Sequence, residues 1–160
     1  MNKERLRILQ DMPIFGGIQE GVLGFLLDQS TDTAFSAGNY LFRENDPGQS
    51  MYVLETGRVA ILKRWEGTCY RLSELRAGDC VGEMSLIDLG RRSASVFALS
   101  DCEAIELTST SLLELYEHDL EQFALIQMNI SRELSRRLRI ADEALFRELI
   151  QTKQIHPHLE

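Results

Sequence analysis

The sequence predicts a mainly β fold, a barrel or jelly roll flanked by helices, and three observations support this. Short runs rich in Val, Ile, Tyr and Leu recur through the middle of the chain. Turn signals that contain Gly separate these runs at short intervals. A long amphipathic helical pattern follows them. With 160 residues, the chain is long enough for one domain over residues 1–160, with the β part at about 31–108.

Two helices are expected before the β part. Residues 3–10 carry Leu6, Ile8 and Leu9 among charged side chains, and Pro13 ends this weak helical pattern. A second helical pattern covers roughly residues 19–29 and is richer in apolar side chains.

The predicted strands begin near Thr31, where small or polar residues alternate with larger ones. The turn signals are AGN, NDPG, TG, EG and AGD, in that order. The strands predicted between and after them are YLFR, MYVLE, RVAILKR, CYRLSEL, SVFALS and EAIELT. Short strands with regular turns are typical of a closed or double-sheet β structure.

Helices are predicted again at about residues 110–151. Ser111 with Glu114, and Asp119 with Gln122, have the spacing of capping boxes. From Asp119 to about Gln151, one continuous helix would be about 48 Å long. Because this exceeds the width of a small barrel, one end must project or pair with a partner. Apolar residues recur on it at steps of three and four: Phe123, Ile126, Ile130, Leu134, Leu138, Ala141, Leu145 and Leu149.

Composition excludes several function classes. The formal net charge of −8 argues against direct nucleic-acid binding and against binding to anionic membranes. No apolar run approaches the roughly 18 residues that span a bilayer, and the charged start MNKERLRILQDMP predicts a cytoplasmic protein. The three cysteines, Cys69, Cys80 and Cys102, are expected to be buried thiols rather than a disulfide framework.

The segment VGEMSLIDLGRRSAS, residues 81–95, has the features of a phosphate site. Gly82 allows a tight entry, and residues 84–87 are expected to form one helical turn whose N–H groups face an anion. Arg92 supplies positive charge, while Glu83 suits a sugar hydroxyl better than a phosphate. Together these groups indicate a nucleotide. The alternative is a surface ion pair between Glu83 and an arginine.

The segment resembles the phosphate-binding cassette of the cyclic nucleotide-binding domain family, which includes catabolite-activator sensor domains and protein kinase A regulatory subunits. That cassette reads Gly-Glu, small or apolar residues, a turn, then Arg, two small residues, Ser or Thr, and Val. PIFGGI, AGNYLFRENDPGQSMYVLETGRVAI and LRAGDCVGE resemble the family in the same order. The resemblance covers about residues 10–150. It implies an eight-stranded β-roll with N-terminal helices and a long C-terminal helix.

The resemblance also implies a role for each site residue. Glu83 would accept a hydrogen bond from the ribose 2′-hydroxyl, and Arg92 would pair with an equatorial phosphate oxygen. Backbone groups of Ser85 and Ala94 would complete the phosphate cradle. The remaining expected ligand-binding residues are Leu72, Val81, Gly82, Met84, Ser93 and Ser95. Arg91 stands where many relatives have proline and is not placed on the phosphate.

The resemblance leaves the base open between cAMP and cGMP. Ser93 follows the cassette arginine, where a hydroxyl can contact guanine in some relatives but also occurs in a cAMP binder. Ala141 and Asp142 stand near the position of a base-contacting hydroxyl pair, and an acidic side chain there could accept from guanine. The alternative for Asp142 is a solvated helix residue. Family frequency favours cAMP, with cGMP next; no cofactor is expected.

The final helix is the expected output element, lying over the nucleotide as a lid. Its apolar seam of Phe123, Ile130, Leu134, Leu138, Ala141 and Leu145 predicts burial against the roll or in a homodimer. A downstream protein partner is implied but not identified. Four arginines on this helix are interpreted as a solvated face with acidic partners such as Glu133, or alternatively as a docking patch: Arg132, Arg136, Arg137 and Arg139.

Three other functions compete with a non-enzymatic cyclic-nucleotide sensor. A metal-dependent cupin enzyme needs histidines on strands, whereas His118, His156 and His158 all lie outside the strand region. The chain could also be the sensor half of a larger transcription regulator, channel or enzyme. A β-roll that only dimerises, without binding a nucleotide, is the third alternative, and the intact Glu83 and Arg92 argue against it.

Overall fold

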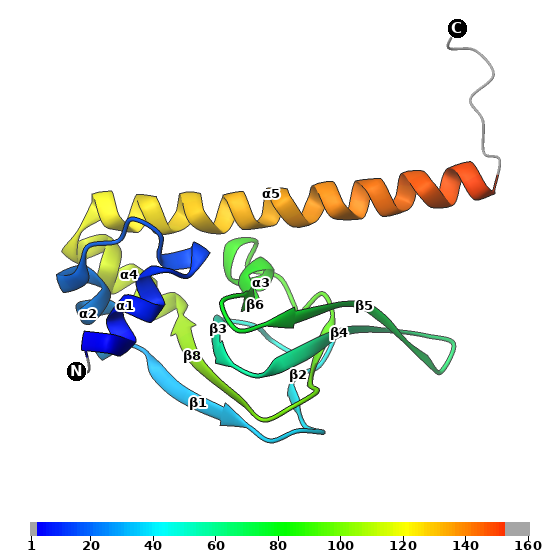
Figure 1. Ribbon diagram of the computed structural model, residues 1–160, viewed down its shortest axis with the longest axis horizontal. Coiled ribbons are helices and arrows are strands. Elements are labelled where there is room, and N and C mark those ends of the chain that lie inside the picture. Colours follow the sequence, from blue (N-terminus) through cyan, green and yellow to red (C-terminus); the bar gives the residue numbers. More distant parts are fainter. Residues whose placement is uncertain (1–2, 153–160) are drawn as a thin grey trace, which may run out of the picture.

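The computed structural model describes residues 3–152 and shows two four-stranded antiparallel sheets flanked by helices (Figure 1). The first sheet has the order β1 (Thr31–Phe35), β8 (Cys102–Thr108), β3 (Ser50–Thr56) and β6 (Cys80–Val81). The second has the order β2 (Tyr40–Phe42), β7 (Ser95–Ala98), β4 (Arg58–Trp65) and β5 (Thr68–Arg76). The predicted eight-stranded β-roll is confirmed.

The turn residues explain where the strands end. Glu66 and Gly67 join β4 to β5, and both have positive φ angles of 46° and 81°. Two positive φ values in a two-residue turn match the right-handed twist of a hairpin, and Gly adopts such a conformation without strain. Only β6, which has two residues, is too short to recognise as a strand from its own side chains.

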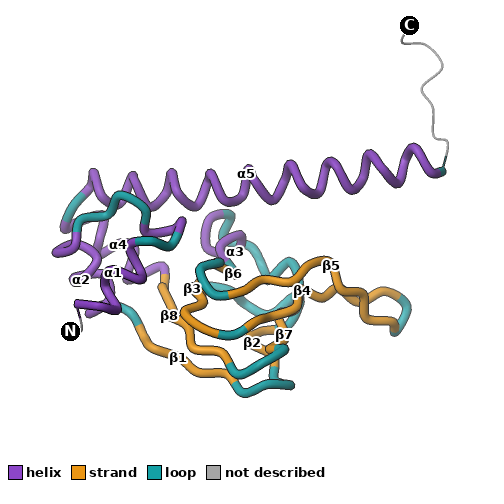
Figure 2. Tube along the Cα trace, viewed as in Figure 1, coloured by secondary structure: helices purple, strands orange, loops and turns teal. Residues whose placement is uncertain are grey.

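The helices before and after the roll gather at one end of it (Figure 2). They are α1 (Lys3–Gln10), the 3₁₀ turn η1 (Pro13–Phe15), α2 (Glu20–Asp28) and α4 (Ser109–His118). Their apolar side chains form one core with the inner side chains of β3 and β8, and a second core lies inside the roll. The helices predicted at residues 3–10 and 19–29 therefore correspond to α1 and α2.

The first predicted capping box is wrong in its position. Thr108, not Ser111, is the N-cap of α4: its side chain accepts from the Ser111 N–H at 3.1 Å, and the Ser111 hydroxyl accepts from the Thr108 N–H at 2.8 Å. The helix thus begins three residues earlier than expected. At the next helix, Asp119 Oδ1 accepts from the Gln122 N–H as predicted, whereas the Gln122 side chain accepts from the Gln19 N–H instead of closing the box.

The long helix α5 (Leu120–Gln151) projects well beyond the roll (Figure 1). Its first half is packed: Ile126 and Ile130 are buried, with Phe123 and Leu134 against the same core. The predicted seam is buried against the protein in this half, whereas its remaining members are exposed in the single chain: Leu138, Ala141 and Leu145. The apolar pattern continues past the point where the roll can cover it.

The cysteine prediction needs one correction. All three thiols are free, and Cys80 and Cys102 are buried, but Cys69 is exposed on the β4–β5 hairpin, where the two strands extend away from the core. His118 stacks on Phe25 with 4.0 Å between ring centroids, while His156 and His158 lie outside the described residues. Within residues 3–152, no helix is long and apolar enough to cross a membrane.

Candidate functional site

The cassette begins with a backbone turn that only glycine suits. Gly82, between β6 and the short helix α3 (Glu83–Ile87), has φ 85° and ψ 3°, the left-handed conformation. A Cβ added there would lie 2.5 Å from Arg92 Nη1. Gly82 thus turns the chain into α3, the predicted single helical turn, and leaves room for the guanidinium group.

Arg92 is only 5% exposed and its guanidinium is held by the cassette itself. Nη1 donates to the carbonyl of Ser50 at 2.6 Å, to that of Gly82 at 3.0 Å and to the hydroxyl of Ser85 at 2.9 Å. Nη2 donates to the Ser50 hydroxyl at 3.2 Å, and Arg92 Cζ lies 4.1 Å from the Phe42 ring centroid. All of these partners are neutral.

Burial without a carboxylate partner has two consequences for Arg92. It lowers the pKa of the guanidinium from its ordinary value, because the charged form loses hydration. Arg92 Nε is also the one buried side-chain nitrogen or oxygen among residues 3–152 that lacks a hydrogen-bond partner. A buried cation with a spare donor is suited to an anionic ligand.

Sequence reasoning missed the loop between β2 and β3 that packs on this arginine. A Cβ at Gly48 would lie 2.4 Å from Ser85 Oγ and 2.8 Å from Arg92 Nε. The chain comes this close because Arg92 exchanges backbone hydrogen bonds with Asn45 and Asp46 in the same loop. The sequence ENDPGQS lies within a stretch that resembles the family, but its contact with the cassette depends on the fold of the roll.

Glu83 is 3% exposed and its carboxylate faces α5, not Arg92. Burial raises the pKa of this carboxyl. Arg137 Nη1 donates to Glu83 Oε1 at 3.1 Å, and Arg137 Nη2 donates to the Cys80 carbonyl at 2.6 Å. Glu133, on the same helix, accepts from Arg137 Nε at 2.9 Å. Interpreting Arg137 as part of a solvated face was therefore wrong: this side chain joins α5 to the cassette.

The other predicted residues are only partly brought together. Ser85 is buried, and its hydroxyl donates to the Gly82 carbonyl at 3.1 Å, while Ala94 and Val81 are buried as well. Met84 is exposed and lies beside Ser93, whose hydroxyl is 3.5 Å from the Met84 sulfur. Of the predicted residues, Gly82 and Ser85 contact the Arg92 guanidinium directly.

Ser95 and Leu72 differ from the rest. The Ser95 hydroxyl accepts from the Glu44 N–H at 2.8 Å and so holds the β2–β3 loop. Leu72 lies on β5 with 60% of its surface exposed. Asp142 and Ala141 are exposed on the projecting half of α5.

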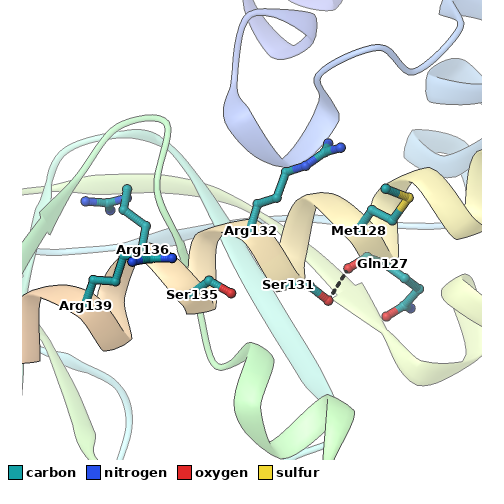
Figure 3. Close-up of a pocket in the computed structure, with 7 residues that line it drawn as sticks. All are labelled: Gln127, Met128, Ser131, Arg132, Ser135, Arg136 and Arg139. Carbon is teal, nitrogen blue, oxygen red and sulfur yellow. Dashed lines mark hydrogen bonds between the residues drawn. The ribbon is translucent and has the colours of Figure 1, made fainter. Parts of the chain in front are cut away.

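A shallow hollow of about 630 Å³ lies along α5 and includes none of these residues. Figure 3 shows that its lining side chains come from α5 alone, with Ser131 bonded to the Gln127 carbonyl. Small serines between Met128 and the arginines Arg132, Arg136 and Arg139 produce it. It is a depression on one helix face, separate from the cassette.

The sequence model described as the cyclic nucleotide-binding domain matches residues 32–119. A "Cyclic AMP receptor protein" of Thermus thermophilus is 32% identical over 135 residues, which cover 84% of this chain and 61% of that protein. The chain therefore spans less than two thirds of this curated relative.

Solved structures agree with the fold. The crystal structure of the Thermus thermophilus catabolite activator protein superposes with a TM-score of 0.73 and 32% identity, covering 87% of this chain and 63% of that one. A cyclic nucleotide-binding domain from Methylobacillus flagellatus superposes with a TM-score of 0.80 over 98% of this chain and 86% of that one; at 23% identity it supports the fold alone. The chain belongs to the cyclic nucleotide-binding domain family.

Proposed function

We propose that the cassette binds a cyclic purine nucleotide, with cAMP preferred over cGMP, and that binding repositions α5. The observation that carries this proposal is the buried Arg92 guanidinium, whose Nε has no partner in the described part of the chain. A cyclic phosphate carries one negative charge, and an equatorial oxygen paired with Arg92 would give this group an ionic partner. The name of the Thermus thermophilus relative supports cAMP as the ligand.

Each cassette residue has a separate task in this proposal. Glu83 accepts a hydrogen bond from the ribose 2′-hydroxyl, and the backbone at Ser85 and Ala94 completes the phosphate cradle. Gly82 and Met84 form the entry turn, while Val81 and Leu72 offer apolar contact. Ser93 and Ser95 lie toward the base. Leu72, on β5, is exposed and therefore free to make such a contact.

The bond between Glu83 and Arg137 gives the signal a route to α5. A ribose hydroxyl that donates to Glu83 changes how strongly this carboxylate holds Arg137, and so changes the preferred position of the helix. A ligand shifts such an equilibrium only by its difference in affinity for the two positions. Micromolar binding provides about 8 kcal/mol in total, and a difference of about 2 kcal/mol is a usable switch.

We expect no catalysis, no direct nucleic-acid binding by this segment, a cytoplasmic location and a homodimer through α5. Exposed side chains at steps of three and four support the dimer: Met128, Ser131, Ser135, Leu138, Asp142 and Leu145. A second candidate, the sensor part of a longer regulator with its own downstream partner, is favoured by the fact that the chain spans 61% of its Thermus relative.

Titration calorimetry with cAMP, cGMP and linear 5′-AMP tests the proposal. We expect heat with the cyclic nucleotides, stronger binding of cAMP, and much weaker binding of 5′-AMP, whose phosphate is not tied to the ribose. If neither cyclic nucleotide binds below about 100 μM, the proposed function is wrong. Hydrogen exchange over residues 120–151, with and without cAMP, tests the movement of α5.

A further inference from the structure

We propose that Tyr52, on β3, is a positioning residue for Arg92 and acts through the hydroxyl of Ser50 and the ring of Phe42. This inference rests on the proposed function, because it concerns how the arginine expected to bind the phosphate is held. It starts from the hydrogen bonds of the buried Arg92 guanidinium, whose partners within residues 3–152 are all neutral. The negative charge that balances this cation must therefore lie beyond direct contact.

The first link between Tyr52 and Arg92 is a chain of hydroxyl groups. Arg92 Nη2 donates to the Ser50 hydroxyl at 3.2 Å, and the Ser50 side chain hydrogen-bonds in turn to Tyr52. The Tyr52 hydroxyl donates to Glu106 Oε1 at 3.0 Å. Tyr52 and Glu106 are directly paired in the register of β3 and β8, so the backbone of the sheet holds them together. Two hydroxyls thus connect the guanidinium to a carboxylate.

The carboxylate at the far end sets the direction of every bond in this chain. An ionised carboxylate only accepts hydrogen bonds, and a hydroxyl has one proton to donate. Because Tyr52 gives its proton to Glu106, its oxygen accepts from Ser50. The Ser50 proton is then directed to Tyr52, and the lone pairs of the Ser50 oxygen remain for Arg92 Nη2. Without the Tyr52 hydroxyl, the Ser50 hydroxyl would be free to rotate and to turn its proton toward the guanidinium.

The second link is a stack of aromatic rings. Arg92 Cζ lies 4.1 Å from the centroid of the Phe42 ring. Phe42 stacks in turn on Tyr52, with 6.1 Å between centroids and 25° between ring planes. Phe35 packs edge-on against the same tyrosine at 5.6 Å. Tyr52 therefore supports the ring on which the guanidinium lies, as well as the hydroxyl to which Nη2 donates.

The charge of Glu106 reaches Arg92 without occupying it. Burial lowers the pKa of the Arg92 guanidinium, and its electrostatic interactions with Tyr52 and Glu106 oppose this, followed by those with Asp46 and Glu83. A carboxylate in direct contact would compete with a phosphate for the same N–H donors. A carboxylate two hydroxyls away stabilises the cation and leaves Nε, which has no partner in the described part of the chain, available to an anion.

Tyr52→Phe tests the inference, because it keeps the ring and removes only the hydroxyl. Tyr40→Phe is the matched control, since the ring of Tyr40 contacts Arg43 and Phe97 on the same roll. In calorimetry with cAMP we expect Tyr52→Phe to raise the dissociation constant about 10-fold and Tyr40→Phe to change it by less than about twofold. Added to Arg92→Gln, Tyr52→Phe should cost less than about twofold more, because it acts through the guanidinium.

A measurement without ligand separates this inference from the proposed function. In ¹⁵N NMR at low temperature, the Nη2 protons of Arg92, identified by their absence in Arg92→Gln, should give a signal in the wild type and in Tyr40→Phe. In Tyr52→Phe this signal should broaden or disappear. If cAMP does not bind but the signal changes as expected, the proposed function is wrong and the role of Tyr52 stands. If cAMP binds, an unchanged affinity in Tyr52→Phe, or a full 10-fold loss that persists in Arg92→Gln, overturns the role of Tyr52 alone.

Discussion

Arg137, on α5, donates a hydrogen bond to the buried carboxylate of Glu83 across 3.1 Å, and the two residues are 54 positions apart in the chain. This ion pair is the direct polar link between the cassette and the long helix, together with the bond from Arg137 to the Cys80 carbonyl. Burial raises the pKa of the Glu83 carboxyl and so disfavours its charged form, whereas the positive charge of Arg137 stabilises that form.

Replacing Arg137 by Gln should make stability depend more steeply on pH. A carboxyl whose pKa is higher in the folded than in the unfolded state binds more protons when folded, so the free energy of unfolding falls as the pH rises through that window. Without Arg137 the pKa of Glu83 rises further and the fall steepens. Urea unfolding between pH 4.5 and 8 should show a loss of about 2 kcal/mol at pH 8 and much less at pH 4.5.

Arg136→Gln is the matched control for this measurement. Arg136 is exposed and bonds only to Glu133 on its own helix among the described residues, so its loss should change stability by less than about 0.5 kcal/mol at any pH. Parallel pH curves for the two variants would show that the Glu83–Arg137 pair has no special role.

Replacing Arg92 by Gln should abolish most nucleotide affinity. The amide cannot form a charged bond to a phosphate, and the loss of one charge-assisted pair corresponds to about 100-fold in the dissociation constant. Arg91→Gln is the control, because the exposed Arg91 donates only to the Asn45 carbonyl in the described part of the chain. Calorimetry with cAMP measures both, after a melting curve has shown that each variant is folded. Equal cAMP affinities of the wild type and Arg92→Gln would show that Arg92 does not bind the phosphate.

Gly48→Ala should disturb the cassette through sterics alone. The added methyl group would meet Ser85 Oγ at 2.4 Å and Arg92 Nε at 2.8 Å, so the guanidinium or the loop must move. We expect weaker cAMP binding and a loss of about 1–3 kcal/mol in the free energy of unfolding. Gly21→Ala, where a Cβ meets nothing within 4 Å on α2, should leave binding unchanged and raise stability slightly. Unchanged binding in Gly48→Ala would contradict the tight packing described for Arg92.

Asn129→Ala should loosen the attachment of α5 to the N-terminal turn. Asn129 Nδ2 donates to the carbonyls of Ile14 at 3.1 Å and Gly16 at 2.9 Å, and the side chain is buried. Unpaired buried carbonyls lower the free energy of unfolding by about 1–3 kcal/mol. Ser131→Ala, two residues away and exposed, removes only a bond to its own helix and should have little effect. Chemical unfolding measures both, and a neutral Asn129→Ala would show that the bonds to η1 do not fix the helix.

The thiols should react at very different rates. Burial raises the pKa of Cys80 to about 12 and also raises the pKa of Cys102, so both stay protonated at pH 8, whereas Cys69 is exposed. A thiol reagent should therefore titrate one thiol rapidly in the native protein and three after unfolding. Cys69→Ser should remove the rapid phase. Two rapid thiols in the wild type would indicate that the cassette strand β6 opens readily.

Much of the fold is local in origin, which is why the sequence predicts it. Strand alternation, Gly-containing turns and the helical spacing of apolar residues place most elements within a few residues of their observed bounds. Errors arise where local patterns compete: Thr108 takes the N-cap position because β8 delivers it there, and Ser111 completes that box instead of starting another. β6 is defined by its pairing with β3 more than by its own two residues.

The sequence by itself determined the cassette, since Gly82, Glu83 and Arg92 are close together in the chain and their chemistry is specific. Tertiary structure alone decided their partners. Gly48 and Ser50 reach Arg92 through the closing of the roll, and Arg137 reaches Glu83 because α5 crosses the cassette one turn after Leu134, which is partly buried against the core. Such pairings depend on the path of the backbone between distant segments, and the residue types at either end do not specify that path.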